Sequence, residues 1–267
     1  MPGSVDEPVL RIAQITDTHL YADPGETLLG LNTRHCLQQV AALAARRKPH
    51  LVVASGDLAH DASPTAYRAV RRSLEPLAVP VYCLPGNHDE AMEMRKCMND
   101  APFRTVSRLR AGGWQMLFLD SSVSGSEGGH LGTAELERLD SDLASAPDSP
   151  AIVWLHHQPV PVGSSWLDTM AVDNGNELLD IVDRHPQVRG IVWGHVHQLF
   201  ELRHKDTLLL ATPSTCIQFL PGSQAFAVDH IPPGYRWFEL YRDGRLASGV
   251  ERLPEIPGNI DTSARGY

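Results

Sequence analysis

The sequence predicts a mixed α/β protein in which two packed sheets are flanked by helices. Apolar runs of strand length alternate with amphipathic helical segments through the first two thirds of the 267 residues. Strand-like runs then dominate, and no internal repeat or long linker divides the chain. This order of elements is typical of sheets covered by helices. We therefore expect one domain over residues 9–253 and an irregular tail over 254–267.

The individual elements follow from periodicity and from turn and capping residues. Six apolar runs have the length and composition of buried strands: residues 9–16, 51–54, 79–84, 114–119, 151–155 and 190–193. Later strands are expected at 207–211, 235–241 and 246–252, the last two joined as a hairpin through residues 242–245. Asn32 and Ser63-Pro64 are typical helix starts. Helices are expected at 32–47, 63–74, 90–98, from 133 onward, and at 176–184.

Composition excludes several functional classes. The net charge of −9 argues against a nucleic-acid partner, which requires clustered Lys and Arg. No apolar stretch approaches the roughly 18 residues of a membrane helix, and residues 1–8 carry no recognisable signal peptide. The cysteines lack metal-type pair spacing, which indicates reduced thiols in a cytoplasmic protein: Cys36, Cys83, Cys97 and Cys216.

Polar side chains follow the predicted buried strands at the points where these strands end. Asn87-His88-Asp89, for example, follows a strand and a Pro85-Gly86 turn. Alone, this run is more typical of an Asx turn with a surface histidine. The pattern recurs, however, and strand ends supply Asp17, His19, Asp57, Asn87, His88, His156, His195 and His197. Because open α/β sheets place their chemistry at the carboxyl ends of strands, the recurrence predicts one functional site.

The chemistry of these side chains predicts a metal centre. Without His88, they comprise two carboxylates, one amide and four imidazoles, which are a suitable ligand set for two metal ions. The mixture of oxygen and nitrogen donors without thiolates favours Fe, Mn, Zn or Co over Mg or Ca. A bimetal site holds its ions roughly 3.5–4 Å apart and presents a bridging hydroxide for in-line attack on phosphorus.

The motifs around these residues resemble the calcineurin-like metallophosphoesterase superfamily. The resemblance rests on Asp17-x-His19, Gly56-Asp57, Gly86-Asn87-His88-Asp89, His156 and Gly194-His195-x-His197. Within the superfamily, the chain is similar to the bacterial 3',5'-cyclic AMP phosphodiesterases at residues 15–20, 165–168, 212–216, 261–262 and 266–267. The resemblance implies a four-layer α/β/β/α sandwich of two mixed sheets flanked by helices.

The resemblance also implies which residues hold each ion. One ion, expected to be iron, would be held by Asp17, His19, Asp57 and His197. The second, expected to be manganese, would be held by Asp57, Asn87, His156 and His195. Asp57 would bridge the two ions, and Zn and Co are the alternative metals.

The expected reaction is hydrolysis of 3',5'-cyclic AMP to 5'-AMP through attack of the metal-bridging hydroxide on phosphorus. His88 would either stabilise the transition state or protonate the leaving oxygen, and Asp89 would fix the His88 tautomer. Trp166 would stack on the base. The expected substrate contacts are His19, Asp57, Asn87, His88, His197 and Trp166.

Several alternatives stay open at this point. His60, Asp61 and residues 215–219 are candidates for the pocket wall, although loop packing explains them equally well. The same site would also suit a glycerophosphodiester or broad-specificity phosphodiesterase. A non-catalytic metal-binding scaffold would be expected to lack a ligand or the acid, and this chain keeps all of them. The expected partner is a small cyclic nucleotide, neither nucleic acid nor membrane, and the protein is expected to be a monomer or homodimer.

Overall fold

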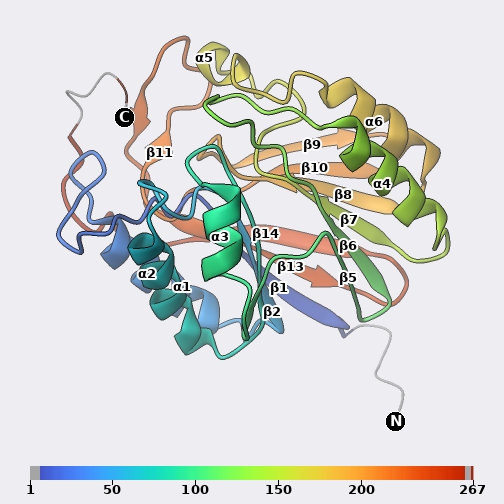
Figure 1. Cartoon of the computed structure of the whole chain (residues 1–267), viewed down its shortest axis with the longest axis horizontal. Helices are drawn as coiled ribbons and strands as arrows, with labels where there is room; N and C mark the ends of the chain where they lie inside the picture. Colours follow the sequence, from blue (N-terminus) through green and yellow to red (C-terminus); the bar gives the residue numbers. More distant parts are fainter. Residues whose placement is uncertain (1–6, 262–265, 267) are drawn as a thin grey trace.

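The computed structural model describes residues 7–261 and residue 266. The sequence features noted at residues 1–6, and the parts of the C-terminal motif at 262–265 and 267, lie outside the described residues. Figure 1 shows the course of the chain, with helices arranged around two layers of strands.

The first sheet is mixed. Its six strands lie in the order β14 (Leu246–Arg252), β13 (Gly234–Leu240), β1 (Leu10–Ile15), β2 (Leu51–Ser55), β3 (Val81–Leu84) and β4 (Phe103–Arg104). The four strands from β1 to β4 are parallel. β13 runs antiparallel to both β1 and β14, which confirms the predicted C-terminal hairpin.

The second sheet is also mixed and has an antiparallel strand at each edge. Its order is β5 (Arg108–Ala111), β6 (Trp114–Phe118), β7 (Ala151–Trp154), β8 (Val188–Trp193), β10 (Thr207–Ala211) and β9 (Phe200–His204). The inner strands β6, β7, β8 and β10 are parallel. A separate short hairpin pairs β11 (Gln218–Phe219) with β12 (Val228–Asp229).

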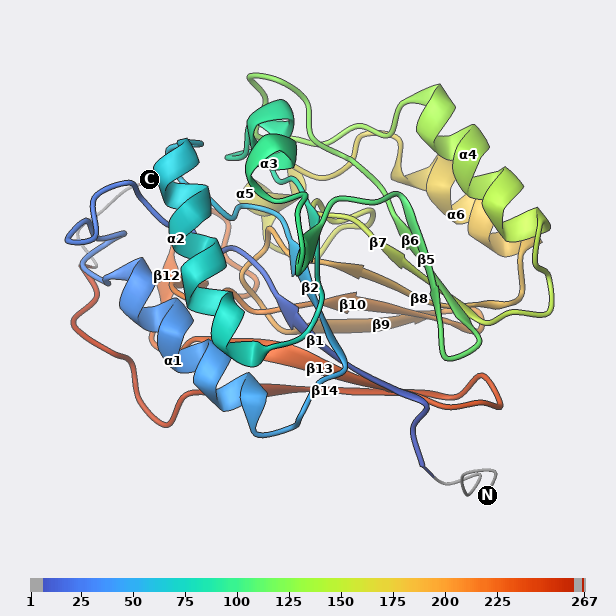
Figure 2. The same cartoon turned by 60° about the horizontal axis from the view of Figure 1, so that its bottom comes forward.

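Helices cover the outer face of each sheet. The first sheet packs against α1 (Thr33–Ala45), α2 (Pro64–Leu74) and α3 (Ala91–Cys97). The second packs against α4 (Thr133–Ala144) and α6 (Gly175–Arg184), and Figure 2 shows these two helices on the opposite side of the strands from α1 and α2. Two short helical segments are η1 (Glu75–Leu77) and α5 (Ser165–Asp168). The predicted four-layer α/β/β/α sandwich is confirmed.

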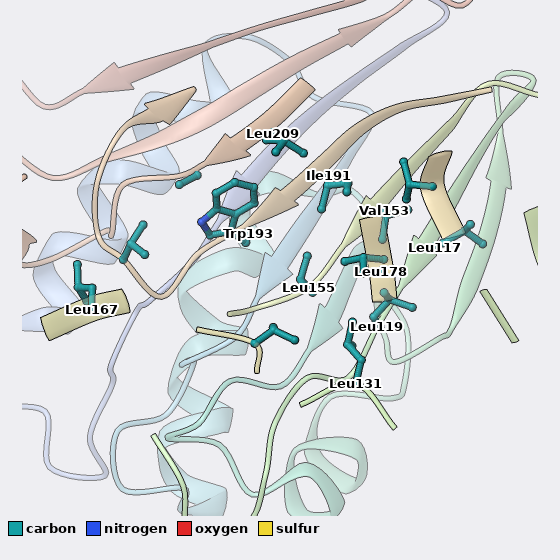
Figure 3. Packing of buried hydrophobic residues seen from close by; sticks show 14 of the residues in the cluster. Leu117, Leu119, Leu131, Val153, Leu155, Leu167, Leu178, Ile191, Trp193 and Leu209 are labelled. Atoms are coloured by element: carbon teal, nitrogen blue, oxygen red, sulfur yellow. The ribbon is translucent and has the colours of Figure 1, made fainter. Parts of the chain in front are cut away.

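Three apolar clusters hold the layers together. One lies between the sheets and includes Trp114, Trp154 and Phe238 from both of them. Another joins the second sheet to α4 and α6, and Figure 3 shows Ile191 and Trp193 in the same cluster as Leu178 of α6. Burial of these side chains is the main force that fixes the sheets against each other.

The helix starts confirm the capping residues expected from the sequence. The Asn32 side chain accepts a hydrogen bond from the His35 N–H at 2.9 Å, and the Ser63 hydroxyl accepts one from Ala66 at 3.1 Å. Pro64 occupies the first turn of α2, where no intrahelical N–H is required. The longest helix among the described residues, α1, has 13 residues, and none of the described helices is a candidate membrane span.

Candidate metal centre

The loops after five parallel strands meet at one edge of the sandwich. β1, β2 and β3 lead into residues 16–19, 56–57 and 85–89, while β7 and β8 of the facing sheet lead into 155–157 and 194–197. Parallel strands end on the same side of a sheet, so the two sheets bring all these loops together.

The predicted ligand atoms lie close together in this region. Asp57 Oδ2 is 3.3 Å from His156 Nε2 and 3.7 Å from His19 Nε2. His197 Nε2 is 3.3 Å from Asp17 Oδ1 and 3.3 Å from His19 Nε2. These five side chains are almost completely buried. His195 is also buried, with its ring centroid 5.1 Å from that of His156, while Asn87 is half-buried.

The backbone at the predicted ligands is unusual. Five non-glycine residues among them have positive φ: Asp17, His19, Asp57, His195 and His197, with values from 44° to 60°. This left-handed conformation is disfavoured for residues with a Cβ atom and is often found at functional sites. Left-handed turns therefore occur in three of the loops that carry the predicted ligands.

Three glycines allow the loops to approach one another. A Cβ atom on Gly56 would lie 2.3 Å from His156 Nδ1, and one on Gly86 would lie 2.2 Å from Asp57 Oδ1. A Cβ atom on Gly194 would lie 2.1 Å from Thr16 Oγ1 and 2.6 Å from Asp17 Oδ2. Glycine is therefore needed at these positions because a side chain would displace the ligand-bearing loops.

Hydrogen bonds at Nδ1 orient the rings of two histidines, His156 and His197. His156 Nδ1 donates to the Ser55 carbonyl at 2.9 Å, and His197 Nδ1 donates to the Ile217 carbonyl at 2.8 Å. A carbonyl can only accept, so in each neutral ring the proton must be on Nδ1. The lone pair is then on Nε2, which faces a carboxylate oxygen at 3.3 Å in both cases.

This arrangement fits metal ions. Two acceptors that face each other at this distance repel unless a cation or a proton lies between them. Asn87 Oδ1, His156 Nε2 and His195 Nε2 are buried atoms that lack a hydrogen-bond partner within the described part of the chain. Buried polar atoms are normally satisfied, so these three atoms are suitable ligands for a metal ion. Oxygen and nitrogen donors of this kind suit divalent first-row metals.

The electrostatics of the site keep His19 and His195 neutral and favour a positive charge between His156 and the two carboxylates. Burial lowers the pKa of His19 and of His195 well below the ordinary value, which keeps both rings neutral. Burial would raise the pKa of Asp57, but the imidazoles around it, His156 foremost, hold that pKa well below its usual range. Burial acts to lower the pKa of His156, but the carboxylates of Asp57 and Asp17 outweigh it and raise that pKa to about 9. A cation is therefore favoured between these groups.

His88 lies at the border between the buried centre and the open cavity. Its backbone N–H donates to Asp57 Oδ1 at 2.9 Å. Its half-buried ring lies edge-on to His19 at 4.9 Å and stacks on His60 at 4.6 Å between centroids. His60 is itself close to His19, with 3.2 Å between the two Nδ1 atoms. The structure thus brings the pocket-wall candidate His60 to the site.

The carboxylate of Asp89 contacts the loop that carries Asp57. It accepts hydrogen bonds from the N–H groups of Gly86, Leu58 and Ala59 at 3.0 to 3.1 Å. Burial and the charge of Asp57 raise the pKa of Asp89 to about 6. These contacts give Asp89 a part in shaping the turn around Asp57, and its role at the His88 ring stays a prediction.

A cavity of about 330 Å³ opens beside the centre. Trp166 lines it together with Asn87, His88 and His195, so the structure brings this predicted base-binding residue to the site. Of the candidate segment 215–219, Phe219 lines the cavity, whereas the Asp61 carboxylate bonds to the backbone N–H groups of Ala22 and Ser63. Sequence reasoning missed further lining residues, including Glu127, Thr169, Met170 and Phe226. They come from loops without any motif.

Gly194→Ala provides a test of the close loop packing. We expect a loss of metal affinity of about tenfold to a hundredfold, because the new methyl group displaces Asp17 and its neighbour Thr16. Metal titration of the purified variant measures this loss. Gly132→Ala is the matched control, since a Cβ atom there meets nothing within 4 Å. Equal metal affinity in both variants would contradict the role assigned to Gly194.

Comparison with known proteins identifies relatives over almost the whole chain. A family model described as calcineurin-like phosphoesterase matches residues 10–199. The chain is 38% identical over 266 residues to the 3',5'-cyclic adenosine monophosphate phosphodiesterase CpdA of Pseudomonas aeruginosa, covering 99% of this chain and 97% of that protein. It is 42% identical over 262 residues to the protein of the same name from Escherichia coli (strain K12), covering 97% and 95%.

Solved structures agree on the fold. A dimetal phosphatase from Danio rerio has a TM-score of 0.67 at 16% identity, covering 92% of this chain and 99% of that chain. The purple acid phosphatase PPD1 from yellow lupin has a TM-score of 0.66 at 15% identity, covering 98% and 54%. At these identities the likeness concerns the fold alone.

Proposed function

This chain belongs to the calcineurin-like phosphoesterases, and on that premise we propose that it hydrolyses 3',5'-cyclic AMP to 5'-AMP at a dinuclear metal centre. The observation that carries the proposal is the position of the cavity. It joins the predicted ligands Asn87 and His195 to aromatic side chains, so one pocket offers both a phosphate-binding end and a base-binding end. Its volume of about 330 Å³ lies within the usual range for small-molecule sites.

We assign one ion to Asp17, His19, Asp57 and His197 and the other to Asp57, Asn87, His156 and His195. When bound, two such ions supply a hydroxide nucleophile at neutral pH and neutralise the phosphate charge. The assignment is supported by the converging Nε2 lone pairs and by the unsatisfied Asn87 Oδ1. Iron in the first site and manganese in the second are the pair that the resemblance implies, and the oxygen and nitrogen donor sets suit both metals.

The protein's own groups complete the reaction. The Nδ1 hydrogen bonds of His156 and His197 to backbone carbonyls hold the two rings in place at the phosphate-binding end of the pocket. Fixed ligands favour the in-line geometry of the reaction. His88 lines the cavity next to the centre, so its ring is placed to protonate the O3' leaving oxygen or to stabilise the charge that develops on it. Trp166, packed edge-on against Phe219 at 5.0 Å, is placed to stack on the base.

Chelator-treated protein tests the proposal. We expect it to lose turnover of cyclic AMP and to recover it when iron and manganese are added, because metal-free ligands cannot activate water. Chromatography identifies the product, and elemental analysis identifies the metals retained during purification. Glycerophosphodiesters at equal concentration serve as the comparison substrates.

Different results of these assays test the substrate assignment and the assignment of the leaving oxygen. A higher kcat/KM for glycerophosphodiesters, or no cyclic AMP turnover in metal-loaded protein, would overturn the substrate assignment. Product that is 3'-AMP rather than 5'-AMP would contradict the assignment of O3' as the leaving oxygen.

A further inference from the structure

His60 occupies the position at His19 that backbone carbonyls occupy at two other proposed ligands. The ring nitrogen of a metal-bound histidine that faces away from the metal normally donates a hydrogen bond, which fixes the ring. His156 and His197 donate to carbonyls in this way. At His19 the partner is a side chain, because its Nδ1 lies 3.2 Å from Nδ1 of His60. A side chain can be replaced, so this contact can be tested by mutation.

The hydrogen bond between His19 and His60 has a definite direction. His19 Nε2 lies 3.3 Å from His197 Nε2 and 3.7 Å from Asp57 Oδ2, so this nitrogen faces the proposed ion. A nitrogen that binds a metal must offer its lone pair, and the proton of the neutral His19 ring is then on Nδ1. Two N–H groups would repel each other at 3.2 Å, so Nδ1 of His60 carries a lone pair and accepts.

The ring of His60 also contacts His88, whose ring lines the cavity. The two imidazoles stack with their centroids 4.6 Å apart and an interplanar angle of 26°. The Tyr21 ring packs on His60 as well, with 4.6 Å between centroids. His88 in turn lies edge-on to His19 at 4.9 Å. One imidazole therefore contacts both a proposed ligand of the first ion and the residue proposed to act on the leaving oxygen.

The backbone fixes the position of His60 relative to His19. The His19 N–H donates to the Asp57 carbonyl at 2.9 Å, and the Leu20 N–H donates to the Leu58 carbonyl at 3.1 Å. The His60 N–H donates back to the Leu20 carbonyl at 2.9 Å. These bonds pair the two loops directly beyond the parallel strands β1 and β2. The two imidazoles therefore start from neighbouring backbone positions that are held by hydrogen bonds.

We propose that His60 is a positioning residue that accepts a hydrogen bond from the His19 Nδ1–H and supports the ring of His88. The inference rests on the proposed dinuclear function and adds a residue that orients a ligand of the first ion and the group at the leaving oxygen. The two contacts use different parts of His60, since the Nδ1 atom contacts His19 and the face of the ring contacts His88. They can therefore be removed one at a time.

Two substitutions separate the hydrogen bond from the stacking contact. The Oδ1 atom of asparagine is bonded to Cγ, as Nδ1 of histidine is, so His60→Asn keeps an acceptor without a ring. His60→Phe keeps a ring without an acceptor. We expect His60→Phe to weaken binding of the ion at His19 about tenfold to a hundredfold, the usual effect of losing such a partner. His60→Asn should bind both ions as the wild type does. Titration of chelator-treated protein with Fe²⁺ and with Mn²⁺ measures these affinities without any substrate.

Steady-state kinetics at saturating metal measure the stacking contact. His60→Asn should lower kcat for cyclic AMP about tenfold to a hundredfold, because a misplaced His88 ring loses its geometry at the leaving oxygen. His60→Phe, which keeps a ring against His88, should have nearly the kcat of the wild type once metal is saturating. In a His88→Ala background, His60→Asn should cause no further loss, because its effect on kcat acts through His88.

His35, on the exposed face of α1, provides the matched controls. His35→Asn and His35→Phe should change neither metal affinity nor kcat. Wild-type metal affinity in His60→Phe, or an equal loss in His60→Phe and His60→Asn, would overturn the hydrogen-bonding role. A further loss of kcat when His60→Asn is added to His88→Ala would overturn the supporting role.

The metal titration also separates this inference from the proposed function. Wild-type protein that binds no metal would overturn the proposed function and this inference with it. Wild-type protein that binds two ions without hydrolysing cyclic AMP would overturn the proposed substrate alone, because the metal affinities of the two His60 variants still decide the role of His60 at His19.

Discussion

Asp57→Ala is expected to empty both metal sites and to lower turnover by about 10³-fold or more, since the variant loses the charge stabilisation that both ions supply. The reason lies in the two contacts of one carboxylate oxygen. Asp57 Oδ2 is 3.3 Å from His156 Nε2 in one proposed site and 3.7 Å from His19 Nε2 in the other. Elemental analysis after loading with excess metal gives the number of ions per chain.

Two further variants show whether the loss of both ions is specific to the bridging position of Asp57. His197→Ala should weaken mainly one site, because His197 Nε2 faces Asp17 and His19. Asp61→Ala should keep both ions, because the Asp61 carboxylate is bonded to the backbone N–H groups of Ala22 and Ser63. Full occupancy in Asp57→Ala, or equal loss of both ions in Asp57→Ala and His197→Ala, would contradict the bridging position.

The parts of the fold that were predicted correctly are those with a local signal. Strands β2, β7 and β8 are buried on both faces and therefore appear in the sequence as continuous apolar runs. The edge strands β5 and β9 were missed because each is largely exposed, and Arg108–Ala111 and Phe200–His204 contain no such run. The four-residue helix α5 is too short to show a helical period.

At the site, too, the residues with a local sequence signal could be predicted and the others could not. The predicted ligands could be found because each follows a buried strand, and parallel strands end at one edge. The partners that orient them could not be found in this way. Ile217, whose carbonyl bonds to His197, and Phe226, which lines the cavity, come from irregular segments whose position depends on tertiary packing. Any residue type can supply a backbone carbonyl, so no sequence pattern marks this role.

His88→Ala is expected to keep both metal ions while losing about 10² to 10⁴ in turnover of cyclic AMP, the usual contribution of a general acid or base. The His88 ring lines the cavity and is outside the proposed ligand set, while the backbone N–H of His88 donates to Asp57 Oδ1. Loss of the side chain therefore leaves the ligand set intact. Metal analysis and steady-state kinetics of the same preparation measure the two effects, and His35→Ala, on the exposed face of α1, is the histidine control.

Substrates with different leaving groups distinguish the two roles proposed for His88. Protonation matters most when the departing oxygen is a poor leaving group such as the ribose O3', and little when it is a nitrophenolate. A loss on cyclic AMP that largely disappears with a nitrophenyl diester would identify His88 as the acid. Equal losses on both substrates would instead assign it to stabilisation of charge on the phosphoryl oxygens. Normal activity of His88→Ala on both substrates would exclude both roles, and loss of metal from this variant would mean that the ring belongs to the ligand set.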